Sequence, residues 1–158
     1  MFSLKRKQKG FTIVELLIVI VVIGILATLV IVTFTGIQKK ARDSQRQTDI
    51  NATNGQLAAF YTNYGFYPTV ADLQTASFLS SYMKGLDPES LKDPKGPSKN
   101  VTGGTAAVDQ YSYVAAGTGC TNGTASTITA GEPQDNSCDS YTLTAKLESG
   151  TDFVKKSN

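Results

Sequence analysis

The feature that most constrains this chain is a long apolar run near its amino terminus. The run covers residues 11–34 and contains a single charged residue, Glu15. As an α-helix rising ~1.5 Å per residue it would be about 36 Å long, which exceeds the ~30 Å hydrocarbon core of a membrane. We therefore expect a membrane anchor. A secretory signal cleaved after the run fits less well, because such signals have only ~7–15 apolar residues and no small-x-small site follows here.

Composition excludes several kinds of chemistry. The chain has no histidine and only two cysteines, which rules out His-based catalysis and Cys-only metal sites. Tyr, Asp, Ser and Lys could in principle be catalytic, but no arrangement of them stands out, and we predict no catalytic residue, no metal, no cofactor and no enzymatic activity. Nucleic acid is a possible partner without support, because the chain beyond residue 10 has 11 basic and 13 acidic residues. The other four positive charges precede the apolar run: Lys5, Arg6, Lys7 and Lys9.

Positive charge flanks both ends of the run, so charge alone does not fix its orientation in a membrane. A short basic stretch before an apolar run is typical of a membrane-insertion signal. The sequence after the run is polar and has the character of a secreted domain. We therefore place the amino terminus in the cytoplasm. Four further basic residues follow the run: Lys39, Lys40, Arg42 and Arg46.

The junction between the basic stretch and the apolar run reads Gly10-Phe11-Thr12-Ile13-Val14-Glu15. It resembles the processing site of type IV prepilins and of the related pseudopilins of type II secretion and competence machines. In that family a basic leader ends in Gly, and Phe, Ser or Thr, two apolar residues and Glu follow. The resemblance continues through the apolar run and covers about 30 residues.

The resemblance implies a processing and assembly pathway. A prepilin peptidase would cut between Gly10 and Phe11 and methylate the new amino group of Phe11. Glu15 would pair with that group on a neighbouring subunit, and a buried ion pair of this kind serves chiefly to select register. The implied partners are other copies of the chain in a homopolymeric filament, the prepilin peptidase, and the assembly ATPase and platform machinery. The subunit would lie in the cytoplasmic membrane before assembly and in an extracellular pilus afterwards.

The remaining sequence predicts an α+β fold, in which a long amino-terminal helix packs on a small antiparallel sheet, as in the pilin fold. Residues 37–64 lack proline and carry an apolar stripe at helical spacing, and Gly65 and Pro68 favour a helix end. Ion pairs Lys39–Asp43 and Arg46–Asp49 are expected along the helix. A short helix is expected over residues 70–82 with Thr69 as its cap, and strands over 110–116 and 141–147. Residues 124–130 are a weaker strand candidate, and the tail after Gly150 is either loose or an edge strand.

Four segments follow from these expectations: a cleaved leader (1–10), a transmembrane or filament-core half of the helix (11–36), an amphipathic half (37–65) and a globular domain (66–158). With that domain outside the cytoplasm, Cys120 and Cys138 are expected to form a disulfide, and free thiols are the alternative. The disulfide would contribute about 3 kcal/mol in the chain-entropy model. Loops bounded in this way resemble the variable region of type IV pilins.

The main functional hypothesis is a major-pilin-like structural subunit of a type IV pilus, acting in adhesion, motility or DNA uptake. One alternative is a pseudopilin of a type II secretion or competence machine. Two segments lean towards that alternative, Gly-Phe-Tyr-Pro at 65–68 and Asp-Pro-Lys-Gly at 93–96. The second of these faintly resembles a loop that binds calcium in some pseudopilins, but carboxylates are sparse here. A membrane-anchored ligand-binding module is the other alternative.

Overall fold

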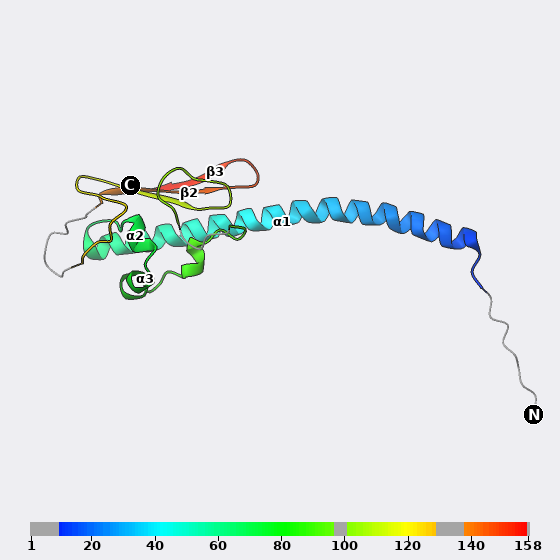
Figure 1. The fold of residues 1–158 in the computed structure, drawn as a ribbon, viewed down its shortest axis with the longest axis horizontal. Helices are drawn as coiled ribbons and strands as arrows, with labels where there is room; N and C mark the ends of the chain where they lie inside the picture. The colour runs from blue at the N-terminus through cyan, green and yellow to red at the C-terminus, as the bar shows by residue number, and fades with distance from the viewer. Residues whose placement is uncertain (1–9, 97–100, 129–137, 158) are drawn as a thin grey trace, which may run out of the picture. The chain divides into compact units, whose positions relative to one another are not determined.

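The computed structural model describes residues 10–96, 101–128 and 138–157, and its fold is α+β, as predicted (Figure 1). The first element of the described residues is one helix, α1 (Ile13–Tyr64), of 52 residues. The predicted end of this helix is confirmed, because Gly65 follows with φ +79° and donates its N–H to the carbonyl of Tyr61 at 2.7 Å. A left-handed residue of this kind ends a helix, and glycine adopts it without strain. Residues 1–9 of the predicted leader (1–10) lie outside the described residues.

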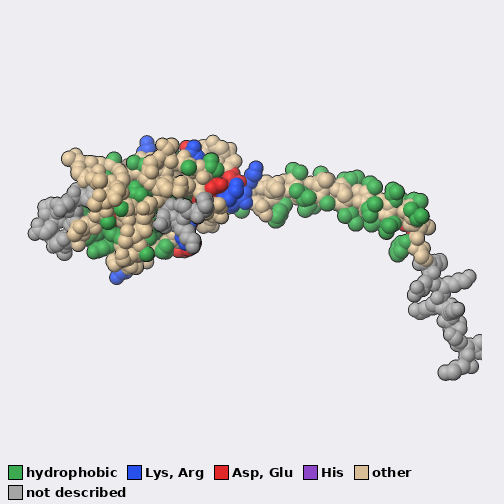
Figure 2. Space-filling model, viewed as in Figure 1, with side chains coloured by type: hydrophobic (Ala, Val, Ile, Leu, Met, Phe, Trp, Pro, Cys, Tyr) green, Lys and Arg blue, Asp and Glu red, His purple; other side chains and the backbone are tan. Residues whose placement is uncertain are grey.

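Contacts divide the chain into two compact units, with the boundary between Gln38 and Lys39. In the first unit the described residues are all exposed, and apolar side chains cover much of the face of α1 that Figure 2 shows. Because residues 16–23 are all apolar, such side chains surround the helix. Over the described residues, α1 is the one helix long and apolar enough to cross a membrane. A helix that is apolar on every side needs an apolar environment all round, either lipid or other helices.

The second unit contains a three-stranded antiparallel sheet in the order β1-β2-β3. Strands β1 (Ser112–Ala116) and β2 (Ser140–Lys146) correspond to the two stronger sequence predictions, which are confirmed. Strand β3 (Asp152–Lys156) lies in the tail and forms an edge of the sheet, as one of the two alternatives predicted. Residues 124–128 are not a strand, and that prediction is wrong for them, because Thr124 and Ser126 hydrogen-bond to the Thr69–Asp72 turn instead. Residues 129 and 130 are outside the described part.

The core of this unit lies between the second half of α1, the sheet and the short helices. Tyr113, Leu143 and Ala145 are fully buried or nearly so on one face of the sheet. Two tyrosines join the core to α1 through their hydroxyl groups, Tyr111 to Asp49 and Tyr141 to Asn54, each at 2.8 Å. Helix α1 contributes three buried apolar side chains to the same cluster: Ile50, Leu57 and Phe60.

The helix predicted over residues 70–82 is two short helices, α2 (Val70–Leu73) and α3 (Ala76–Tyr82). Thr69 caps α2 as predicted, in a reciprocal capping box with Asp72. The single predicted helix is wrong at Thr75, whose backbone is extended and whose hydroxyl donates to the carbonyl of Ala71 at 2.8 Å. Threonine competes with the helix in this way. A 3₁₀ turn, η1 (Pro88–Leu91), follows.

Candidate processing and assembly site

The peptide bond between Gly10 and Phe11 lies just before α1, outside any regular structure. Phe11 is 90% exposed, and among the described residues other than its chain neighbours no atom comes within 4 Å of the place where a Cβ on Gly10 would stand. An extended and accessible backbone is what a peptidase requires of its substrate, because a helical peptide bond is held by its own hydrogen bonds. The geometry around Gly10 and Phe11 therefore suits cleavage at this bond.

Glu15 takes part in a capping box at the start of α1. The Thr12 backbone N–H and its hydroxyl both donate to Glu15 Oε2 at 2.8 Å, and the Glu15 N–H donates to the Thr12 hydroxyl at 3.2 Å. These bonds satisfy donors that the first helical turn leaves without a partner. The Thr-x-x-Glu spacing of residues 12–15 is the sequence signal for this capping box, which was not among our predictions. Glu15 thus has a local structural role in the single chain.

The surface beside Glu15 is apolar and hollowed. Phe11, Leu16, Ile18 and Val19 line, together with Glu15, a hollow of about 550 Å³. A carboxylate at the edge of apolar surface can hold a cationic group that arrives with an apolar neighbour, because a low dielectric strengthens the attraction between opposite charges. The arrangement fits an ammonium group carried on a second apolar helix.

A second group of polar residues gathers around Arg46 in the globular unit. Arg46 is fully buried, and its Nε and Nη2 donate to the two carboxylate oxygens of Asp93 at 2.7 and 3.0 Å. Its other contacts are Asp43 at 3.0 Å and Asp109 and Glu148 at 3.2 Å each. We call Arg46 and these four acids the Arg46 cluster. It joins α1 to three segments that are far away in the sequence.

The expected pairs Lys39–Asp43 and Arg46–Asp49 are both wrong. The Asp43 carboxylate accepts hydrogen bonds from Arg46 and from the backbone N–H groups of Glu148 and Ser149. Asp49 accepts from Gln45 and Tyr111 instead of Arg46. The Asp43–Arg46 and Gln45–Asp49 pairs also have helical spacing. Spacing alone could not select them, because the choice depends on further partners that lie about 50 to 100 residues away.

Hydrogen bonds shift the pKa values of the cluster. Arg42 donates two hydrogen bonds to the Glu148 carboxylate, at 2.5 and 2.8 Å. These bonds, with a smaller contribution from Arg46, lower the pKa of Glu148 from 4.5 to about 2. Burial alone would raise the pKa of Asp43, but the backbone N–H groups of Glu148 and Ser149 outweigh it and lower this pKa. The Asp93 carboxylate raises the pKa of Arg46. All three groups are therefore charged at neutral pH.

Gly96 has a packing role in the Asp93–Gly96 segment. A Cβ on Gly96 would lie 2.1 Å from the carbonyl oxygen of Asp109, a distance that no side chain can occupy. The segment that carries Asp93 thus packs closely against Asp109, and both aspartates accept hydrogen bonds from Nη2 of Arg46. Over the part of the chain that the structure describes, no group of three or more potential ligand side chains is placed to hold a metal ion.

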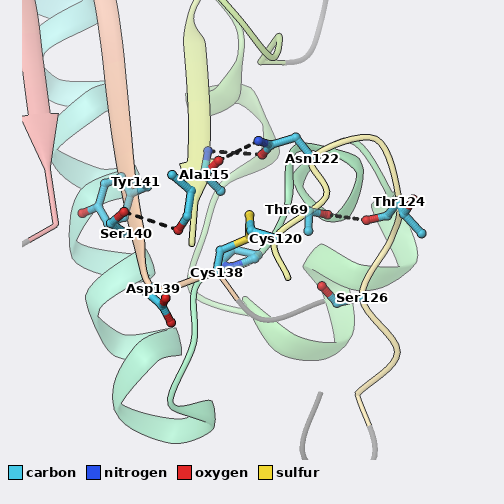
Figure 3. The surroundings of a disulfide bond; sticks show 12 residues. Thr69, Ala115, Cys120, Asn122, Thr124, Ser126, Cys138, Asp139, Ser140 and Tyr141 are labelled. Atoms are coloured by element: carbon cyan, nitrogen blue, oxygen red, sulfur yellow. Dashed lines mark hydrogen bonds between the residues drawn. A yellow bond between two sulfur atoms is a disulfide. The ribbon is translucent and has the colours of Figure 1, made fainter. Parts of the chain in front are cut away.

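Cys120 and Cys138 are joined by a disulfide (Figure 3). Beside it, the side chain of Asn122 pairs with the backbone of β1: its Nδ2 donates to the Ala115 carbonyl at 2.6 Å, and its Oδ1 accepts from the Ala115 N–H at 3.2 Å. The backbone of Cys138 also forms an isolated antiparallel β-bridge with Tyr67, which lies just beyond the end of α1. The disulfide therefore lies where the segment after β1, the start of β2 and the end of the long helix converge.

Comparison with known proteins finds a family match in the amino-terminal segment. A family model described as the prokaryotic N-terminal methylation motif matches residues 5–31. The type II secretion system core protein G of Dickeya chrysanthemi is 38% identical over 66 residues, which cover 42% of this chain and 43% of that protein. These matches support a resemblance of the chain to the pilin and pseudopilin family. The resemblance drawn from Gly10, Phe11 and Glu15 is thus confirmed at the level of the family.

Further relatives refine this placement. The core protein G of Aeromonas hydrophila is 40% identical over 41% of this chain and 46% of that protein. The type IV major pilin protein PilA of Myxococcus xanthus is 32% identical over 42% of this chain and 30% of that protein. The chain thus spans less than half the length of these relatives, and the secretion proteins are the more similar. No solved structure matches the chain at a significant level.

Proposed function

We propose that the chain is a pseudopilin-type structural subunit. It is inserted in the cytoplasmic membrane through the first half of α1, with its amino terminus in the cytoplasm. A prepilin peptidase cuts it after Gly10 and methylates Phe11, and an assembly ATPase and platform then drive it into a filament of like subunits. The exposed, non-helical Gly10–Phe11 bond directly before a capped apolar helix is the observation that carries this proposal.

The exposed apolar side chains of α1 support polymerisation through the helix. Burying a Leu or Ile side chain from water contributes about 1.5–3 kcal/mol, so about twenty such side chains amount to tens of kcal/mol. Lipid is as apolar as the side chains, however, and transfer from membrane to filament gains far less. A motor that extracts the subunit is therefore part of the proposal.

Cleavage changes what Glu15 can pair with. In the uncut chain its carboxylate accepts two hydrogen bonds from Thr12. Cutting after Gly10 creates an ammonium group on Phe11, and Glu15 of an incoming subunit then pairs with that group on its neighbour. The pairing sets the axial register, because an unpaired charge among apolar helices is strongly unfavourable.

Two variants separate the register role of Glu15 from its capping role. Thr12→Val removes the capping hydroxyl and leaves the carboxylate, whereas Glu15→Ala removes both functions. Mass spectrometry of the amino terminus should show cleavage after Gly10 in both variants, while a bulky residue in place of Gly10 should block it. Thr12→Val should assemble and Glu15→Ala should not. Normal filaments from Glu15→Ala, or none from Thr12→Val, would contradict the register role.

A surface pilus is the second candidate, favoured by the disulfide near the carboxyl end and the similarity to PilA. Deletion of the gene distinguishes the two functions. Loss of secreted enzymes from the medium, with surface filaments unchanged in electron micrographs, is expected of a pseudopilin. Loss of surface filaments with normal secretion would instead establish a pilus subunit.

A further inference from the structure

Four basic residues follow the apolar run of α1, and the fold neutralises two of them. Arg42 forms an ion pair with Glu148 at 2.5 Å, and Arg46 is enclosed by the four acids of its cluster. Both side chains are therefore committed to partners within the globular unit. Their charge is not available to a partner outside the chain.

The other two, Lys39 and Lys40, are left free. Both are exposed, and no hydrogen bond or ion pair joins either of them to any residue that the structure describes. They are adjacent on α1, so their side chains leave the helix axis about 100° apart. One carboxylate of a neighbouring protein cannot receive two lysines that diverge in this way, because consecutive helical residues do not face each other.

The position of the two lysines along the helix suits a lipid headgroup. Lys39 follows Phe34, the last residue of the apolar run, by five residues, or about 8 Å of helix. The headgroup layer on each side of a bilayer is about 5–8 Å thick, and phosphates surround a membrane-spanning helix in every direction. Divergent lysines at this depth can each reach a different phosphate, and their long stems allow them to do so over a range of helix tilts.

We propose that Lys39 and Lys40 bind anionic phospholipid headgroups and thereby hold the globular unit at a fixed depth before assembly. This inference rests on the membrane-anchored state of the proposed function. The interaction is electrostatic, with each ammonium group donating hydrogen bonds to phosphate oxygens. At the strength typical of a basic residue near an anionic membrane surface, each lysine enriches anionic lipid about fivefold and the pair about 30-fold.

The test uses the full chain reconstituted in bilayers of phosphatidylcholine with a minor fraction of phosphatidylglycerol. The variant is Lys39→Gln/Lys40→Gln, and the matched control is Lys84→Gln/Lys156→Gln, which removes the same charge from two exposed positions of the globular unit. The amount of phosphatidylglycerol retained by each protein after gentle extraction is measured by mass spectrometry, at low and high salt. Carbonate extraction reports separately whether each protein is inserted.

The expected result is strong enrichment of phosphatidylglycerol by the wild type and the control, and its loss in the Lys39/Lys40 variant and at high salt. Equal enrichment by all three inserted proteins would overturn the inference and leave the proposed function intact. Normal lipid enrichment combined with failed filament assembly in the Lys39/Lys40 variant would assign the two lysines to a neighbouring subunit and would also overturn it. A wild type that is not inserted at all would contradict the proposed function itself.

Discussion

Replacing Arg46 by Met tests whether the Arg46 cluster holds the globular unit together. Methionine fills similar space but leaves Asp43 and Asp93, both less than 10% exposed, without their cation. Removing one partner of a buried ion pair costs about 3–5 kcal/mol, because the remaining charge is buried and uncompensated. At roughly 3–4 °C per kcal/mol for a domain of this size, the midpoint of thermal unfolding should fall by about 10–20 °C.

Arg42→Met is the matched control. It removes the same charge from the same helix, but the Arg42 side chain is 28% exposed and has one acidic partner. Partly exposed ion pairs contribute about 0–1 kcal/mol, so this variant should unfold within a few degrees of the wild type. The full chain in detergent is suitable, with unfolding followed by near-UV circular dichroism, since the protein has seven tyrosines and no tryptophan.

A double variant shows whether the loss arises from uncompensated charge. Arg46→Met/Asp93→Asn removes the buried carboxylate that Arg46→Met leaves behind, and it should recover part of the lost stability. Two results would contradict this role of Arg46. One is an unfolding midpoint of Arg46→Met equal to that of Arg42→Met. The other is a loss of stability in the double variant equal to the sum of the losses in Arg46→Met and Asp93→Asn.

Three further predictions concern the globular unit. Replacing Cys120 and Cys138 by Ser should lower the free energy of unfolding by about 3 kcal/mol, measured in denaturant against the oxidised wild type; an unchanged value would contradict it. Asn122→Ala should cost about 1–3 kcal/mol and speed hydrogen exchange at Ala115, whose N–H loses its acceptor; unaltered exchange would count against the Asn122 bridge. Because the folded-state pKa of Glu148 is lowered from 4.5 to about 2, its contribution is present above pH 4.5 and is lost as the pH falls towards 2. A scan of unfolding midpoint against pH should therefore show a shallower acid limb in Glu148→Gln, and identical limbs would refute this.

The features predicted well from the sequence are those that local patterns encode. The end of α1 at Tyr64 follows from Gly65 and the nearby Pro68, and the alternating residues of β1 and β2 predicted both strands and their antiparallel pairing. At the amino terminus, the Gly10–Phe11–Glu15 pattern was enough to predict the resemblance to pilins and pseudopilins, which the match to the N-terminal methylation motif supports. Each of these signals lies within a few residues of the element that it specifies.

The features missed depend on partners that are remote in the chain. No local sequence pattern indicates that Asp93, 47 residues after Arg46, would accept hydrogen bonds from both Nε and Nη2 of the Arg46 guanidinium group. Asn122 lies between the two cysteines, where the sequence predicted only a disulfide-bounded loop, yet its amide pairs with the backbone of Ala115 as a strand would. Local spacing predicted short-range pairs because it contains no information on which segments later pack together.

The sheet is protected at both of its edges. The amide of Asn122 covers part of β1, and β3 carries Lys155 on its inner face, with Nζ 5.5 Å from the ring centre of Phe153. An inward lysine and a covered backbone both discourage a foreign strand from joining an open edge. In the proposed filament, where many copies lie close together, these features discourage amyloid-like growth through the described edges of the sheet.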